Sequence, residues 1–131
     1  MDIKAFAEKF IAAEDEAWMR GNFAPLEALE TPDVVYHMPA PYGDMVGFQG
    51  HKQFIEQNRQ GITEHRQDWG YLTGDGSVLA LSYKSSAKRV SDNPMMPGTE
   101  GKRMVSDGLF IFRVETGRVA EAWFTGTTKI E

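Results

Sequence analysis

The chain has 131 residues, of which 41% are hydrophobic and 25% charged. This length and composition are typical of one globular domain spanning residues 1–131, and they exclude a disordered or collagen-like chain. The absence of cysteine excludes disulfides and thiolate chemistry, and the net charge of −5 argues against nucleic-acid binding. No stretch approaches the roughly 18 consecutive apolar residues of a membrane span, so we expect a cytoplasmic domain with neither a nucleic-acid nor a membrane partner.

The first predicted element is a helix that Asp2 can cap and Gly21 can end. Glu14 interrupts its apolar face, because at about 100° per residue it falls between Phe10 and Trp18. A carboxyl group in that setting would be desolvated and its pKa raised, so Glu14 is a candidate general acid. The alternative is a side chain that reaches the rim or pairs with Arg or Lys. The apolar face comprises Ile3, Phe6, Ala7, Phe10, Ala17 and Trp18.

A short second helix is predicted over residues 23–30, with Pro25 in its first turn and Thr31-Pro32 at its end. Residues 33–38 are predicted to form a strand, and a loop rich in Pro and Gly follows it. A third, weakly amphipathic helix is predicted over residues 51–60.

Four long strands are predicted after Gly61, over residues 64–73, 77–90, 103–114 and 118–130. Segments 74–76 (GDG) and 115–117 (ETG) have good hairpin-turn chemistry. Segment 91–101 carries Met95 and Met96 and is either a flap over a pocket or a solvated loop. Helices followed by antiparallel strands favour an α+β fold, in which one curved sheet with helices on a single face encloses a pocket.

Six short phrases follow one another along the chain: residues 17–22 (AWMRGN), 29–39 (LETPDVVYHMP), 47–50 (GFQG), 101–103 (GKR), 112–113 (FR) and 117–123 (GRVAEAW). In this order they resemble the SnoaL-like polyketide cyclases of the nuclear transport factor 2-like superfamily, over nearly the whole chain. The resemblance implies a cone, in which a strongly curved antiparallel or mixed sheet and three N-terminal helices enclose a cavity. It also implies a small apolar ligand in the cone and a homodimer through the outer face of the sheet.

The catalytic residues of three activities in this superfamily do not carry over. Cyclases have an aspartate in the pattern Gly-x-Asp-x-x-Arg where this chain has Phe110, and a histidine where it has Lys88. Ketosteroid isomerases carry their base before the proline of the first strand, where this chain has Met38. Limonene epoxide hydrolases have Arg-x-Asp where Ser82 and Lys84 stand.

Glu14 and His37 remain as the candidate catalytic residues. Glu14 lies seven residues before Gly21, the offset at which ketosteroid isomerases place an oxyanion-hole tyrosine. His37 stands where epoxide hydrolases carry a water-positioning asparagine, and it shares a strand face with Val35, opposite to Tyr36. Histidine can move protons near neutral pH. The alternative for His37 is a core position with a bond to a backbone carbonyl.

The walls of an apolar pocket are predicted to comprise Trp18, Phe110, Phe112 and Trp123. Ser106 and Gly108 share the face of Phe110 and are small enough to leave room for a ligand. Asp107 is the lone acid in this strand segment. Simple alternation places Asp107 on the outer face, whereas a bulge near Gly108 would turn it toward the ligand.

Other residues are expected outside the site. His51 and His65 are predicted at the surface, and Tyr36, Trp69 and Tyr83 in the sheet or an interface. The histidines have no metal-ligand spacing, and no phosphate-binding glycine loop is present. We therefore expect no metal and no cofactor.

These features predict a cofactor-independent isomerase, cyclase or hydratase that acts on an apolar oxygenated ligand of polyketide, steroid or terpenoid type. The replaced acids favour an alternative, a ligand-binding or sensor domain without catalysis. A dimeric interaction module is a third interpretation, which a pocket filled by its own side chains would favour.

Overall fold

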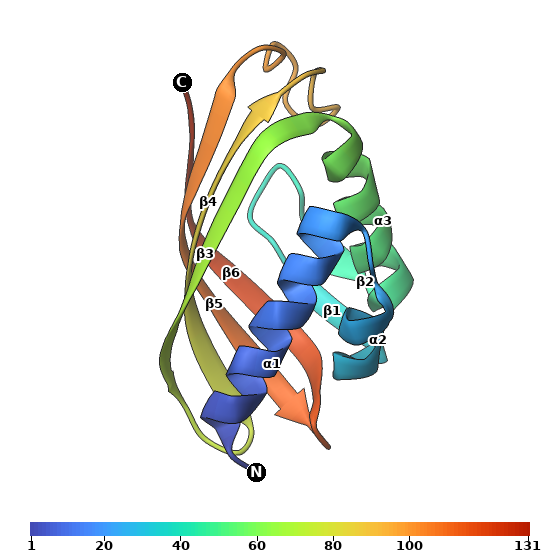
Figure 1. The fold of residues 1–131 in the computed structure, drawn as a ribbon, viewed down its shortest axis with the longest axis vertical. Coiled ribbons are helices and arrows are strands. Elements are labelled where there is room, and N and C mark those ends of the chain that lie inside the picture. Colours follow the sequence, from blue (N-terminus) through green and yellow to red (C-terminus); the bar gives the residue numbers. More distant parts are fainter.

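The computed structural model describes residues 1–131, in which the helices lie against one side of a curved sheet (Figure 1). The helices are α1 (Ile3–Asp15), α2 (Ala24–Leu29) and α3 (Gly47–Gln60), and a π-helical turn, η1 (Glu16–Arg20), follows α1. The strands are β1 (Glu30–His37), β2 (Asp44–Val46), β3 (Ile62–Gly74), β4 (Val78–Arg89), β5 (Arg103–Glu115) and β6 (Arg118–Ile130).

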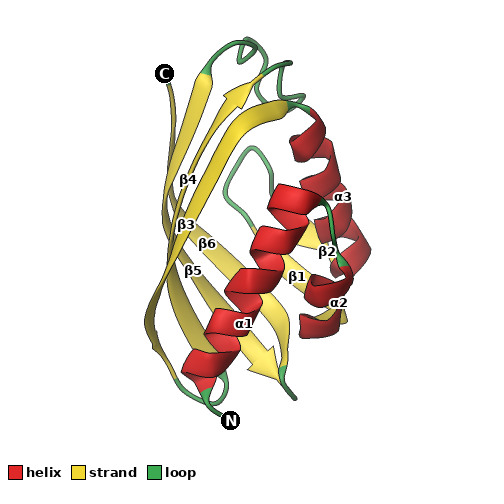
Figure 2. Ribbon diagram, viewed as in Figure 1, coloured by secondary structure: helices red, strands yellow, loops and turns green.

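The six strands form one mixed sheet in the order β2-β1-β6-β5-β4-β3. Neighbouring strands are antiparallel except for β1 and β6, which are parallel. The sheet is open, with β2 and β3 at its edges, and α1 and α3 cross its concave side (Figure 2). This arrangement confirms the predicted α+β class with a curved, mixed sheet and three helices on one face.

The ends of the first helix follow from its sequence. Asp2 caps α1 by accepting a hydrogen bond from the Ala5 backbone N–H at 3.1 Å. Gly21 ends the π-helical turn with a φ of 68°, which glycine adopts without strain, and the Arg59 guanidinium packs where a side chain would be. The buried face of α1 carries Phe6 and Phe10, and it continues to Glu14.

Strand β1 begins at Glu30, which the sequence pattern had assigned to the end of a helix. The reason is tertiary, because Glu30 pairs in parallel with Val119 of β6. Pro32 is accommodated at a register shift between Glu30 and Val35, so it does not stop the strand. As a result the Glu30 side chain is buried, on the same side as Val34 and Tyr36.

The core fills the space between the concave side of the sheet and the helices. Its largest fully buried apolar side chains are Phe10, Leu26, Val34, Ile55, Leu79, Leu81, Phe112 and Val119. Phe10 of α1 meets Phe112 of β5 edge to face, with ring centroids 5.0 Å apart, and so joins the first helix to the sheet. None of the three helices combines the length and apolar content that a membrane crossing requires.

Strands β5 and β6 approach closely where Gly108 pairs with Gly126. A Cβ atom at Gly108 would lie 2.7 Å from the Gly126 Cα atom and 2.9 Å from Cζ of Phe124. We expect Gly108→Ala to lower the free energy of unfolding by about 1–3 kcal/mol, because the strands would have to separate. Urea denaturation measures this change. Gly76→Ala is the control, because a Cβ atom added at this turn would meet no other heavy atom within 4 Å. An equal effect of both substitutions would contradict the explanation.

Candidate functional site

A pocket of about 340 Å³ lies between the concave side of the sheet and the helices. This volume is in the range of small-molecule sites. The pocket is mostly apolar, and its aromatic walls comprise Trp18, Tyr36, Tyr42, Phe54, Trp69, Tyr83, Phe110 and Phe124. The Nε1 atom of Trp69 is buried without a hydrogen-bond partner.

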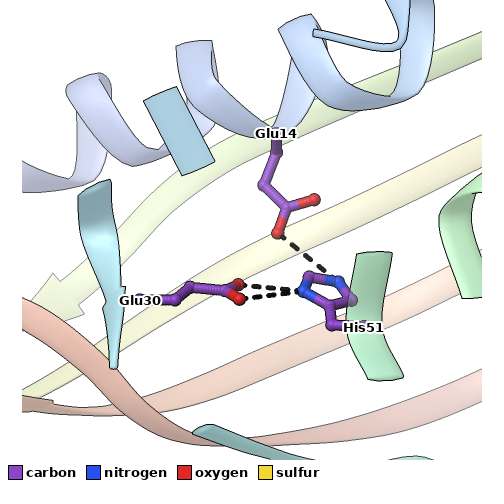
Figure 3. Close-up of side chains that lie close together, drawn as sticks. All are labelled: Glu14, Glu30 and His51. Atoms are coloured by element: carbon purple, nitrogen blue, oxygen red, sulfur yellow. Dashed lines mark hydrogen bonds and ion pairs between the residues drawn. The ribbon is translucent and has the colours of Figure 1, made fainter. Parts of the chain in front are cut away.

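Four polar side chains, all almost fully buried, meet at one wall of this pocket; Figure 3 shows three of them. We call them the acid–imidazole cluster: Glu14, Glu30, Tyr36 and His51. Nδ1 of His51 lies 2.9 Å from Oε2 of Glu30. The Tyr36 hydroxyl donates to the same Glu30 atom at 2.6 Å. Oε1 of Glu14 lies 3.3 Å from the Tyr36 hydroxyl oxygen and 4.0 Å from Nε2 of His51.

Three elements bring the cluster together. Glu14 extends the buried face of α1, and Glu30 and Tyr36 share the inward face of β1. His51 belongs to the buried face of α3 with Ile55, and its ring stacks on Tyr36 at a centroid distance of 3.9 Å. Glu14, Tyr36 and His51 line the pocket, whereas Glu30 lies behind them and bonds to two of them.

The environment separates the protonation states of these groups. Burial, with a smaller contribution from the nearby Glu30 charge, raises the pKa of Glu14 from 4.5 to about 7. Burial alone would lower the pKa of His51, but Glu30 and Glu14 together raise it above its usual value. Burial and both carboxylates raise the pKa of Tyr36 well above 10, so it stays a neutral phenol. The raised pKa of His51 favours its charged form beside Glu30, and Glu14, with a pKa of about 7, is poised to gain or lose a proton near neutral pH.

The cluster also has the donor types of a metal site. Ligand atoms of Glu14, Glu30 and His51 lie within 4.8 Å of one another, and carboxylates with an imidazole suit zinc or a similar divalent ion. The Glu30 carboxylate, however, is already engaged by His51 and Tyr36. These internal bonds give each donor a partner within the protein.

The structure places three of the expected site residues in the pocket wall, namely Glu14, Trp18 and Phe110. Phe112 does share the face of Phe110, and their rings stack at 5.4 Å. It lies deeper, however, and is fully buried against Phe10, because α1 covers it. Phe112 is therefore a core residue rather than part of the pocket surface.

His37 and Trp123 lie outside the pocket, in contrast to the expectation for both. Alternation along β1 holds, but the inward face is that of Tyr36, so His37 points outward. Its Nδ1 lies 3.0 Å from Asp44 and its Nε2 2.6 Å from Glu121. Its ring stacks on Trp123, the neighbouring residue on β6, whose exposed fraction is 40%.

Asp107 is exposed and does not line the pocket. It pairs with Lys84 on β4 and Thr127 on β6, and both registers are continuous through Gly108. The bulge that would have turned Asp107 inward is absent, and the carboxylate stays on the outer face.

Sequence reasoning missed several residues of the site. His51 was expected at the surface but is only 4% exposed, because α3 begins four residues earlier than predicted and places Phe48, His51 and Ile55 on one buried face. That spacing was the available signal. His65 is half-buried in the pocket wall beside Trp18. Trp69, Tyr83 and Tyr36 are sheet residues as expected, but all three face the pocket.

Segment 91–101 contributes two side chains to the pocket, Asn93 and Met96. Asn93 donates a hydrogen bond from Nδ2 to the Tyr42 hydroxyl at 3.0 Å. Met95 is 49% exposed and points elsewhere. The segment therefore forms part of the pocket wall through Asn93 and Met96.

Residues 7–122 match the family model described as a SnoaL-like domain. Similar solved structures include TsrD from Streptomyces laurentii, with 20% identity, a TM-score of 0.77, and 94% of this chain and 89% of that chain covered. A SnoaL-like polyketide cyclase from Agrobacterium tumefaciens has 16% identity and a TM-score of 0.72, with 93% and 91% covered. An NTF2-like protein from Burkholderia xenovorans has 14% identity and a TM-score of 0.71, with 95% and 88% covered. At these identities the likeness shows the fold. A comparison with curated proteins found no match.

Proposed function

Because the chain belongs to the SnoaL-like family, we propose that it is a cofactor-independent enzyme that moves a proton on an apolar, oxygenated small molecule. The observation that carries this proposal is the Glu14 carboxyl group, buried in the wall of a mostly apolar pocket with its pKa raised to about 7. Carboxyl groups with such pKa values serve as general acids and bases at neutral pH.

In the proposed reaction, the neutral Glu14 carboxyl donates its proton to a carbonyl oxygen of the ligand. Its second oxygen accepts a proton from the adjacent carbon, so that an enol forms and the carboxyl group is regenerated. Nε2–H of the His51 imidazolium lies near Glu14 and can donate to the same developing negative charge. Glu30 is a positioning residue, since it holds Tyr36 and His51 from behind. Isomerisation, ring closure and hydration can each proceed through such an enol.

A binding or sensor domain without catalysis is the second candidate. It is favoured by the apolar Met38 and Phe110 in the pocket wall, where relatives of known activity carry acids. An interaction module is less compatible with a pocket of about 340 Å³. The homodimer through the outer face of the sheet and the cytoplasmic location stay predictions.

A thermal-shift screen of polyketide, steroid and terpenoid ligands, followed by assays of the hits for conversion, tests the proposal. We expect Glu14→Gln to lower kcat by about 100-fold or more with little change in KM, because the amide cannot transfer a proton. In the unchanged protein, kcat should fall as the pH rises above 7 and Glu14 loses its proton.

Glu27→Gln, at an exposed position on α2, is the matched control and should leave kcat unchanged. Equal turnover by Glu14→Gln and the unchanged protein would refute the assigned role of Glu14. A ligand that binds equally to both proteins and is converted by neither would instead support the binding domain.

A further inference from the structure

Arg89 lines the pocket at a distance from the acid–imidazole cluster. It is the last residue of β4 and pairs with Ile62, directly after the C-terminal end of α3. His51 and Asn58 both line the pocket from α3, and seven residues of helix rise about 10 Å. Arg89 lies beyond Asn58, with its guanidinium against Gly61.

The Arg89 side chain is almost fully buried and forms no ion pair, although its charge still acts on the carboxylate of Asp92. The residue is 3% exposed, and its Nε donates to the Ser91 backbone oxygen at 3.0 Å. Arg89 takes part in none of the ion pairs of the structure and makes no other side-chain hydrogen bond. The carboxylate of nearby Asp92 bonds instead to the backbone N–H groups of Gly98 and Glu100. The four N–H donors on its Nη atoms have no partner in the protein and are not sealed off from the pocket, so they are available to an anion of a ligand.

The surroundings of Arg89 have the form of a recognition site. Gly61 leaves the space that the guanidinium occupies, since a Cβ atom there would lie 2.5 Å from Nη2. Tyr42 lines the same pocket and accepts a hydrogen bond from Asn93, which leaves its own hydroxyl hydrogen free to donate. Arginine and a phenol hydroxyl together suit a planar oxyanion.

We propose that Arg89 binds a carboxylate, or a chemically equivalent oxyanion, of the ligand. The substrates would then be amphipathic acids, with an apolar body against the aromatic walls and the anionic group roughly 10 Å or more from the carbonyl at Glu14. This inference rests on the proposed function, because it assigns the substrate class of the same pocket.

Two fluorescent probes test the inference by binding alone. Anilinonaphthalene sulfonate and N-phenylnaphthylamine share one aromatic skeleton and differ by the sulfonate. We expect the unchanged protein to bind the sulfonate probe at least tenfold more tightly than the neutral one. Arg89→Met should lower the affinity for the sulfonate probe tenfold or more and leave that for the neutral probe unchanged. Naphthoate should displace the sulfonate probe at least tenfold better than naphthamide does.

Arg118→Met is the matched control, because it removes the same charge from an exposed position outside the pocket. Its affinity for both probes should equal that of the unchanged protein. Equal loss of sulfonate binding in both variants would overturn the inference. The inference would also be overturned if Arg89→Met kept the same preference for the sulfonate probe over the neutral probe.

If Arg89→Met fails to fold, the probe and displacement measurements on the unchanged protein still test the inference. Equal affinity for the two probes, or equal displacement by naphthoate and naphthamide, overturns the role of Arg89 and leaves the proposed function standing. If neither probe binds, both the inference and the ligand-binding pocket are refuted.

Discussion

Replacement of Glu30 with alanine is expected to lower the free energy of unfolding by about 3–5 kcal/mol in urea denaturation at pH 6. The substitution leaves the His51 imidazolium in a buried site with only Glu14 nearby, at 4.0 Å, and it leaves the Tyr36 hydroxyl without its acceptor at 2.6 Å. With the Glu30 charge removed, burial should lower the pKa of His51, which NMR titration of the imidazole measures.

The loss of stability caused by Glu30→Ala should become smaller as the pH rises. His51 has a raised pKa in the folded protein, so its ion pair with Glu30 contributes stability below the unfolded pKa of 6.5 and loses that contribution as the pH rises through the folded pKa. The difference between Glu30→Ala and the unchanged protein should therefore shrink at alkaline pH. Glu27→Ala, on the exposed face of α2, should change stability by no more than about 0.5 kcal/mol. If Glu30→Ala were equally mild, the cluster would not be an ion pair.

Replacement of Glu14 with glutamine is expected to stabilise the protein by roughly 3 kcal/mol at pH 8 and to have little effect near pH 4. The folded state raises the pKa of this carboxyl from 4.5 to about 7, and each unit corresponds to about 1.4 kcal/mol. Because the folded protein holds the Glu14 proton more tightly than the unfolded chain does, the contribution of protonated Glu14 to stability is fully present below pH 4.5. The unchanged protein loses this contribution as the pH rises through 7. A neutral amide does not bear the cost of ionisation in a buried site.

Urea midpoints at pH 4, 6 and 8 for Glu14→Gln and the unchanged protein measure this effect, with Glu27→Gln as the control. Together with the expected loss of turnover, higher stability at pH 8 would mark Glu14 as a group retained for function rather than for folding. A Glu14→Gln protein destabilised equally at all three pH values would show instead that Glu14 has a structural role.

Much of the fold could be predicted because its signals are local. β5 and β6 lie within one residue of their predicted ends, since the ETG turn and alternating side chains define a hairpin without reference to the rest of the chain. The position of Glu14 on the buried face of α1 follows from helical periodicity alone. Gly21 ends the helical segment in the left-handed conformation expected of a terminal glycine.

The rest of the site depends on contacts between distant segments. Glu30 is in a strand because β6, almost ninety residues later, pairs with it. Alternation correctly separates His37 from Tyr36, but only packing decides which face of β1 is covered. Burial of Val34 and Tyr36 removes more apolar surface from water than burial of Val35 and His37 would. The apolar content of the two faces therefore favours the face of Val34 and Tyr36 as the inward one, as the structure has it.

The acid–imidazole cluster is assembled from α1, β1 and α3, whereas most of the pocket wall beyond it comes from β3 to β6. The first 51 residues of the chain thus hold the groups of the proposed proton transfer, and the remainder mainly shapes the pocket. Substitutions at Trp69, Tyr83 or Phe124 can reshape the space around a ligand while Glu14 and His51 keep their mutual geometry. In a fold divided in this way, the range of accepted ligands can diversify, by natural drift or by directed evolution, while the reaction itself is inherited unchanged.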